Sequence, residues 1–251
     1  MKILLTSSHT LGWAGDLNPA NGLLDELKDS LVGPIRCVMV SSYPDDVEIT
    51  DRMAWEIREC FDRADLPFKE FKVLDRRTQN SVGRMLRRAN FIILCGGHVP
   101  TENRFFNDLH LKWRLSSFDG LMLTISAGSM NCAETVYSSP ELEGESLDPD
   151  YQIHMEGLGL TNVNILPHFQ TLKKATLDGR KLVDDIVAGH SWMHPVWCLP
   201  DGSYFLIEGD RTELRGKAYR MKDGKLRLVC HDNERKLILP NGRLQRIPTI
   251  E

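Results

Sequence analysis

One serine stands at the point where an apolar strand is predicted to end and a helix to begin. Residues 121–129 read LMLTISAGS, so Ser126 directly follows the apolar run and directly precedes Ala127 and Gly128. A tight strand-to-helix turn of this kind lifts a hydroxyl group above the edge of a sheet, where it can act as a nucleophile. The backbone N–H of Ala127 is then expected at a helix N-terminus, facing the oxyanion that forms during acyl transfer.

The pattern around Ser126 departs from the G-x-S-x-G consensus at one position. Thr124 occupies the place of the first glycine. The residues after the serine are compatible with a helix as far as Tyr137. The alternative interpretation of this segment is a small-residue turn that packs tightly and carries out no chemistry.

A second glycine turn ends the preceding apolar run. Residues 95–98 read CGGH, and the carboxyl ends of neighbouring parallel strands meet at the same edge of a sheet. Glycine lets the backbone approach closely, so the N–H of Gly97 is a candidate for a second oxyanion donor beside Ser126. Taken alone, a Gly-Gly pair is equally typical of a simple turn.

A serine nucleophile needs a base and an acid that orients the base. His168 is the distinctive histidine of the eight, because it follows an apolar run at another strand end. His190 and His194 are spaced i, i+4, but no glutamate stands between them as in H-E-x-x-H, and we predict no metal site. For the acid, the residues leave several carboxylates open: Glu141, Asp148 and Asp150 in an acidic loop, and Asp201 on a tight turn.

These residues are embedded in an alternation of short apolar runs and amphipathic stretches. Strands are predicted at 2–6, 35–40, 71–74, 91–95 and 121–125, and helices at 21–31, 50–64, 79–88 and 104–116, with Thr50 as an N-cap. The alternation is typical of an α/β fold whose mostly parallel sheet is covered by helices on both faces.

The second half of the chain has a different pattern. A loop at 138–150, a strand at 162–166 and a helix at 181–188 precede four strands at 196–199, 204–207, 217–220 and 226–229. Asp-Gly pairs at 201–202 and 223–224 predict two β-hairpins. We expect a single domain over 1–251 with a β-hairpin tail from about residue 196.

Composition excludes several classes of protein. With 31 basic and 35 acidic residues, the net charge of −4 argues against a nucleic-acid partner. No apolar run is long enough to span a bilayer and no signal peptide is recognisable, so no membrane association and a cytoplasmic location are expected. The six scattered cysteines are typical of buried thiols, and no cofactor motif such as G-x-G-x-x-G is present.

Four segments in the same order resemble the peptidase E (aspartyl dipeptidase) family, which also includes cyanophycinases. They are FIILCGGH at 91–98, SAGS at 126–129, LPHF at 166–169 and CLPDG at 198–202. The resemblance implies a flavodoxin-like sheet related to class I glutamine amidotransferase domains. It also implies a catalytic triad of Ser126, His168 and Asp201, with aspartate in place of the family's glutamate.

The resemblance further implies the reaction and its substrates. Family members cleave short peptides, among them dipeptides with an N-terminal aspartate, through an acyl-enzyme. Arg104 is a candidate for binding the substrate carboxylate, although an arginine on a helix surface is equally typical. His98 replaces the asparagine that usually follows the glycine turn and is a second candidate for contact with the substrate.

Other functions remain open at this point. An esterase or amidase on the same scaffold would use the same three residues, with ester substrates preferred over Asp-X dipeptides. A glutaminase is disfavoured because Ser126 stands where that chemistry requires cysteine. A catalytically silent binding module is the alternative from a different class.

Overall fold

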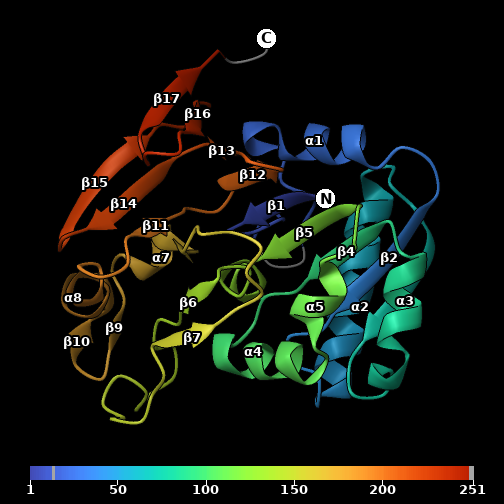
Figure 1. The fold of residues 1–251 in the computed structure, drawn as a ribbon, viewed down its shortest axis with the longest axis horizontal. Helices are drawn as coiled ribbons and strands as arrows, with labels where there is room; N and C mark the ends of the chain where they lie inside the picture. The colour runs from blue at the N-terminus through green and yellow to red at the C-terminus, as the bar shows by residue number, and fades with distance from the viewer. Residues whose placement is uncertain (13–14, 249–251) are drawn as a thin grey trace.

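The computed structural model describes residues 1–12 and 15–248 (Figure 1). The parallel half of its main sheet runs, in spatial order, β1 (Lys2–Thr6), β5 (Leu121–Ile125), β4 (Phe91–Leu94), β2 (Ile35–Val40) and β3 (Phe68–Leu74). Each of these strands was predicted, and the parallel pairing brings their carboxyl ends to one edge. The residues that follow β1, β4 and β5 therefore lie close together.

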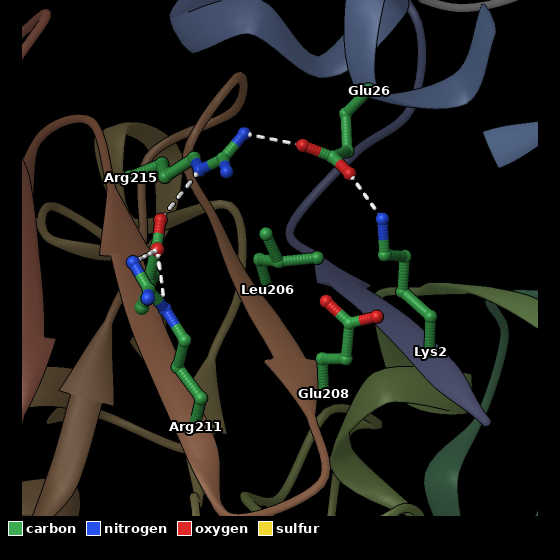
Figure 2. A pocket seen from close by; sticks show the side chains of 7 residues that line it. Lys2, Glu26, Leu206, Glu208, Arg211 and Arg215 are labelled. Atoms are coloured by element: carbon green, nitrogen blue, oxygen red, sulfur yellow. Dashed lines mark hydrogen bonds and ion pairs between the residues drawn. The ribbon is translucent and has the colours of Figure 1, made fainter. Parts of the chain in front are cut away.

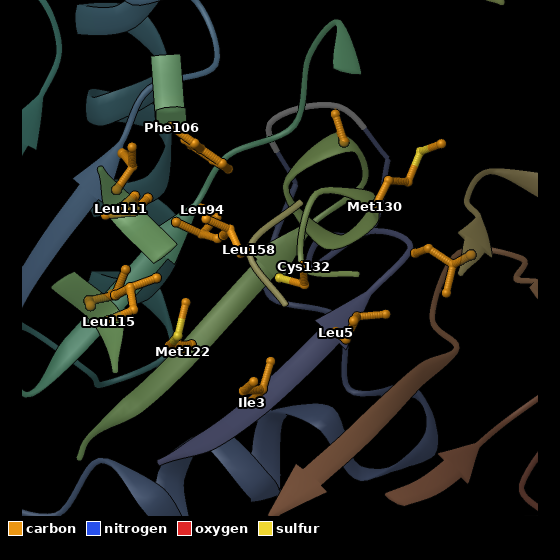
Figure 3. Close-up of a cluster of buried hydrophobic side chains, with 14 of the residues drawn as sticks. Ile3, Leu5, Leu94, Phe106, Leu111, Leu115, Met122, Met130, Cys132 and Leu158 are labelled. Carbon is orange, nitrogen blue, oxygen red and sulfur yellow. The ribbon is translucent and has the colours of Figure 1, made fainter. Parts of the chain in front are cut away.

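Helices cover both faces of this sheet, as the sequence predicted. Helices α1 (Leu23–Ser30) and α2 (Val47–Arg63) pack on one face, and α3 (Val82–Arg88), α4 (Val99–Asp108) and α5 (Leu111–Leu115) pack on the other. Successive strand residues alternate between the two apolar cores; Ile3 and Ile92 belong to one core, and Leu4 and Ile93 to the other. Figure 3 shows the first core, formed by the side chains of strands and of α4 and α5.

The C-terminal strands extend the main sheet and build a second one. Antiparallel strands β12 (Tyr204–Glu208), β13 (Arg211–Arg215), β16 (Arg235–Ile238) and β17 (Leu244–Ile247) continue the main sheet outward from β1. The second sheet contains β8 (Ile165–Leu166), β11 (Val196–Cys198), β14 (Ala218–Lys222) and β15 (Lys225–Cys230). These strands lie to one side of the parallel sheet in Figure 1.

Short elements complete the described residues. The strand pairs are β6 (Thr135–Tyr137) with β7 (His154–Glu156) and β9 (Thr176–Leu177) with β10 (Arg180–Lys181). The helical segments are η1 (Ala20–Gly22), η2 (Gln79–Ser81), α6 (Ala127–Met130), α7 (Phe169–Leu172), η3 (Leu182–Val187) and α8 (Ala188–His190). All six cysteines are buried and free, and no helix among the described residues is both long and apolar enough to cross a membrane.

The hairpin predicted around Asp201 and Gly202 is wrong. Strand β11 belongs to the second sheet and β12 to the main sheet, so this turn carries the chain from one sheet to the other. An Asp-Gly pair specifies a tight turn locally, but tertiary packing decides whether the flanking strands pair with each other. The prediction at Asp223-Gly224 is confirmed, because Lys222 pairs with Lys225 across that turn.

Three helix predictions also need correction. The helix predicted over 104–116 is divided at His110, whose φ of 49° is left-handed, into α4 and α5. The helix predicted to reach Tyr137 ends at Met130, and β6 follows it. The N-cap of α2 is Asp46, whose carboxylate accepts the Ile49 N–H at 2.9 Å; Thr50 is buried inside that helix.

A network of charged side chains ties the C-terminal strands to the parallel half of the sheet (Figure 2). The Glu26 carboxylate on α1 accepts from Lys2 on β1 at 2.7 Å and from Arg215 on β13 at 2.8 Å. Buried Glu213 in turn accepts from Arg215 at 3.2 Å and from Arg235 at 2.8 Å, as well as from Arg211. The network therefore connects α1, β1, β13 and β16.

Glu213 is the centre of this network. Burial opposes ionisation of its carboxyl group, but hydrogen bonds from Arg235 and Arg211 and the charge of Arg215 outweigh that cost and hold its pKa at about 2. The carboxylate is thus charged in the folded protein across the whole neutral range. If it were removed, Arg211 and Arg235 would lose their ion pair, and Arg215 would keep only its ion pair with Glu26.

We expect Glu213→Gln to lower the free energy of unfolding at neutral pH by about 3–5 kcal/mol, because it removes the buried carboxylate that pairs with Arg235 and Arg215. The folded-state pKa lies below the unfolded value, so this contribution is present above about pH 4.5 and is lost as the pH falls toward about 2. Urea unfolding at a series of pH values measures both effects. Glu208→Gln is the matched control, since Glu208 lies beside the network in Figure 2 and has no ion pair among the described residues. Equal effects of the two substitutions would contradict the assignment.

Candidate active site

Ser126 sits in a strained turn between β5 and α6. Its φ of 49° and ψ of −112° are rarely adopted by a residue with a side chain, and such conformations cost about 1–3 kcal/mol. The turn is held by the Ser126 N–H, which donates to the Thr6 carbonyl at 3.1 Å. Gly128 is required next to it, because a Cβ there would lie 2.5 Å from the Cys95 carbonyl oxygen. This is the geometry of a nucleophile elbow.

Thr124, which replaces the first glycine of the consensus, stabilises this turn through hydrogen bonds. Its side chain is buried, and its hydroxyl lies 2.8 Å from the Ser129 hydroxyl. Ser129 in turn donates to the Thr6 carbonyl at 2.8 Å. The departure at Thr124 therefore adds hydrogen bonds beneath Ser126 and leaves the elbow intact.

The structure brings Ser126, His168 and Asp201 into one hydrogen-bonded chain. Ser126 Oγ lies 3.0 Å from His168 Nε2, and His168 Nδ1 lies 2.8 Å from Asp201 Oδ1. His168 has a left-handed φ of 52° and directly precedes α7. Its side chain is 40% exposed, so the ring is open to a substrate. The distances are those required for proton transfer between a hydroxyl, an imidazole and a carboxylate.

Pairing in the second sheet places the histidine beside the aspartate. Strand β8 runs parallel to β11, with Leu166 opposite Cys198, and the Phe169 N–H donates to the Leu199 carbonyl at 3.0 Å. The residues that follow the two strands, His168 and Asp201, consequently leave the sheet at the same edge. His168 therefore contacts Asp201 and none of the acidic-loop carboxylates.

Asp201 accepts hydrogen bonds on both of its oxygens. Ser7 Oγ donates to Oδ1 at 2.7 Å, and Gln170 Nε2 donates to Oδ2 at 2.6 Å. Burial raises the pKa of Asp201, but its hydrogen bond and charge interaction with His168, together with the bonds from Ser7 and Gln170, lower it overall. The carboxylate is therefore ionised and fixed in orientation.

Ser7 is a member of this site that the sequence analysis missed. Its hydroxyl accepts the His168 backbone N–H at 2.7 Å while donating to Asp201, so it connects the two residues a second time. It occupies this position because β1 pairs with both β5 and β12, and the Ser7 N–H donates to the Ser203 carbonyl at 3.3 Å. The available signal was the same as for Ser126: a small polar residue directly after an apolar strand. Gln170 carried no such signal.

The two predicted oxyanion donors lie on segments that adjoin Ser126. Ala127 is the first residue of α6, where a helix leaves its N–H without an internal acceptor. A Cβ on Gly96 would lie 3.0 Å from Ser126 Cβ, and a Cβ on Gly97 would lie 2.7 Å from Ser42 Cβ. Ser42 Oγ also donates to the Gly96 carbonyl at 2.7 Å, which fixes the glycine turn beside the serine.

A buried polar cluster joins α4, which follows the glycine turn, to α6. Asn131 Nδ2 donates to Glu102 Oε2 at 3.1 Å and to the Ala127 carbonyl at 3.1 Å, and Asn103 donates to Asn131 Oδ1 at 2.9 Å. Helix α6 begins at Ala127 and α4 begins two residues after Gly97, so this cluster fixes the helices that follow the two candidate oxyanion donors. Glu102 is fully buried, and its Oε1 has no hydrogen-bond partner among the described residues.

The two weaker candidates, His98 and Arg104, have different surroundings. His98 lies within hydrogen-bonding distance of Thr101 through Nδ1, at 2.9 Å, and of Glu145 in the acidic loop through Nε2, at 2.8 Å. Arg104 is on the exposed face of α4, and the described residues give it no hydrogen bond to the triad. The loop thus folds onto the edge of the glycine turn. Desolvation and the charge of Glu145 raise the pKa of the loop residue Glu141 to about 7.

The buried Glu102 carboxyl group supplies a test of this arrangement. Burial raises its pKa well above the ordinary value, against the hydrogen bond from Asn131, so the group is protonated at neutral pH. Because the unfolded chain releases this proton above about pH 4.5 and the folded chain retains it, Glu102 makes the protein less stable as the pH rises. Glu102→Gln removes this cost and keeps the shape of the side chain.

We expect Glu102→Gln to become more stable relative to the parent protein as the pH rises from about 4.5, the ordinary pKa of the group. Chemical unfolding of both proteins across this range measures the difference. Glu102→Ala is the control, and we expect it to be destabilising at every pH because it leaves a cavity and removes the partner of Asn131. A stability difference that does not change with pH would show that Glu102 is ionised in the folded protein.

Comparisons with known proteins identify the family of this chain. A family model of peptidase family S51 matches residues 44–215, more than half of the chain, and the matched range includes Ser126, His168 and Asp201. The structure resembles a crystal structure described as that of a "Putative Peptidase E Protein from Listeria monocytogenes EGD-e", with a TM-score of 0.54 and 16% identity over 84% of this chain and 96% of that chain. No curated protein gives a significant match. The resemblance inferred from the sequence is confirmed: this chain belongs to peptidase family S51 and is a serine peptidase.

Proposed function

We propose that this protein hydrolyses short peptides, with dipeptides that carry an N-terminal aspartate as its preferred substrates, through an acyl-enzyme formed on Ser126. The observation that carries the proposal is the hydrogen-bonded chain from Ser126 through His168 to Asp201, with the serine in a strained elbow. A serine hydroxyl is a weak nucleophile at neutral pH and reacts only when a base is positioned to take its proton. The chain supplies that base within hydrogen-bonding distance.

The first half of the reaction follows from the positions of these atoms. With the proton of the neutral imidazole on Nδ1, Nε2 accepts the Ser126 proton while Oγ attacks the peptide carbonyl. The carbonyl oxygen becomes negatively charged, and the N–H groups of Gly97 and Ala127 stabilise it. His168 then donates the proton to the leaving amine, and the C–N bond breaks to give the ester on Ser126.

The second half regenerates the enzyme. His168 takes a proton from water, the hydroxyl oxygen attacks the ester carbonyl, and the proton passes to Ser126 Oγ as the acid product leaves. Asp201 stays ionised throughout, fixes the tautomer of His168 and stabilises the imidazolium that forms twice in each cycle. Ser7 and Gln170 keep the carboxylate in place, because each donates to one of its oxygens.

Specificity for an N-terminal aspartate needs a donor for the substrate carboxylate. Arg104 and His98 are the proposed donors. His98 uses Nδ1 for Thr101 and Nε2 for the Glu145 carboxylate, so it would bind the substrate by exchanging Glu145 for the substrate carboxylate. Arg104 lies two residues beyond Glu102 on α4, exposed and without a hydrogen bond or ion pair among the described residues. It is therefore available to a ligand.

The experiment is hydrolysis of a panel of dipeptides with varied N-terminal residues, comparing the parent protein with Ser126→Ala. We expect Asp-X to be cleaved best, and cleavage to fall by a factor on the order of 10⁴ or more in the variant, because the nucleophile is gone. Mass spectrometry after treatment with a serine-directed organophosphorus reagent should show one adduct, on Ser126. Unchanged melting temperatures would exclude loss of fold as the cause.

Other outcomes of the panel identify the alternatives. If simple esters are hydrolysed far faster than any dipeptide, and this activity is lost in Ser126→Ala, the protein is an esterase and not a dipeptidase. No hydrolysis of peptides or esters and no adduct on Ser126 would overturn the catalytic proposal and favour a binding module. Preferred cleavage of dipeptides with a different N-terminal residue would support peptidase activity but contradict the proposed preference for aspartate.

The role of Asp201 has its own test. Asp201→Asn keeps the shape but loses the charge that stabilises the imidazolium, so we expect kcat to fall by about 10³–10⁴-fold. Asp201→Glu restores the charge with one more methylene, and we expect it to retain more activity than the asparagine variant. Steady-state kinetics on the best dipeptide measures both. If the two variants had equally low kcat, the loss of activity would be due to the changed geometry at residue 201 and not to the loss of charge.

A further inference from the structure

A hollow lies at the C-terminal end of α4, between α3, α5 and the segment before α3. Its volume is about 610 Å³, within the range of small-molecule sites, and polar or charged side chains form most of its wall. Helices α3 and α5 cover the same face of the sheet (Figure 1). The hollow shares no residue with the triad or with the hydrogen bonds around it.

Two guanidinium groups converge inside this hollow. A Cβ on Gly83 would lie 2.9 Å from Arg114 Nη1 and 3.5 Å from Arg87 Nη1, so the two nitrogens are separated by at most the sum of these distances. Gly83 is the second residue of α3, in its first turn. Because Gly83 has no side chain, the Arg114 guanidinium can pack directly against the helix backbone.

The described residues supply no counter-charge for these arginines. Arg114 uses Nε to donate to the Leu109 carbonyl at 2.8 Å, and neither Arg87 nor Arg114 forms an ion pair. The carboxylate in the wall is Asp108, and it is already bound by Arg76 at 2.7 Å. Arg84 adds a third positive charge and donates to Ser81 Oγ at 3.0 Å. The hollow is therefore strongly positive in a chain whose net charge is −4.

We propose that this hollow binds a small anion that carries a phosphoryl group. Like charges that lie this close repel each other, and an anion between them converts that repulsion into two charge-assisted interactions. A phosphoryl group presents three oxygens and matches the planar fork of arginine, so it can engage Arg87, Arg114 and Arg84 together; a carboxylate has only two oxygens. The volume leaves room for an organic group attached to the phosphate.

Titration calorimetry with inorganic pyrophosphate at low ionic strength tests the proposal. We expect saturable binding with one site per chain, and a dissociation constant at least about tenfold higher for Arg87→Gln and for Arg114→Gln, since each loses a charged hydrogen-bond donor. Gly83→Ala keeps every charge but displaces the Arg114 guanidinium, and we expect it to weaken binding without lowering the melting temperature.

Arg52→Gln is the matched control, because Arg52 is an exposed arginine on α2, which packs on the other face of the sheet. We expect its affinity for pyrophosphate to equal that of the parent protein. Three results would overturn the proposal: no saturable binding, an equal loss in Arg52→Gln, or binding of succinate as tight as that of pyrophosphate. The last would identify the ligand as a carboxylate.

Discussion

The position of β1 between β5 and β12 is the constraint on which the site depends. Through its parallel partner it holds the turn of Ser126, whose N–H donates to Thr6, and through its antiparallel partner it holds the segment that contains Asp201. Ser7, the residue directly after β1, lies between the two and binds both Asp201 and the backbone of His168. Backbone pairing of one strand therefore aligns Ser126, His168 and Asp201, each of which lies more than a hundred residues from β1 in the chain.

The departures from the family pattern are compensated within the same region. Aspartate is shorter than glutamate, yet Asp201 reaches His168 at 2.8 Å because the turn between the two sheets brings its backbone close, and Ser7 and Gln170 hold both carboxylate oxygens. Thr124 takes the place of glycine and returns a hydrogen bond to Ser129 beneath the elbow. Hydrogen bonds between buried hydroxyl groups and backbone carbonyls thus stabilise the strained backbone conformation of Ser126.

Helix α4 has a cluster of ionisable side chains at each end. Near its beginning, His98 contacts Glu145, and buried Glu102 lies one turn further along; near its end, Asp108 borders the hollow of Arg87 and Arg114. A helix of this length spans about 15 Å, which is longer than the screening length at physiological salt. At that separation, salt screens most of the electrostatic interaction between the two ends of the helix.

The sequence by itself was enough to predict the parallel strands, the Ser126 turn, His168 and the glycine turn. A polar residue directly after an apolar run is a local pattern, and parallel pairing of the strands brings such residues to one edge of the sheet. Even the carboxylate partner could be named by resemblance. Only the tertiary structure showed that the Asp201 turn joins two sheets and that Ser7 binds Asp201. The same holds for the hydrogen bond between Asn131 and Glu102, and for the approach of Arg87 and Arg114 to Gly83. Each of these depends on contacts between segments distant in the chain, and no local spacing or propensity specifies which segments the packing of the cores will bring together.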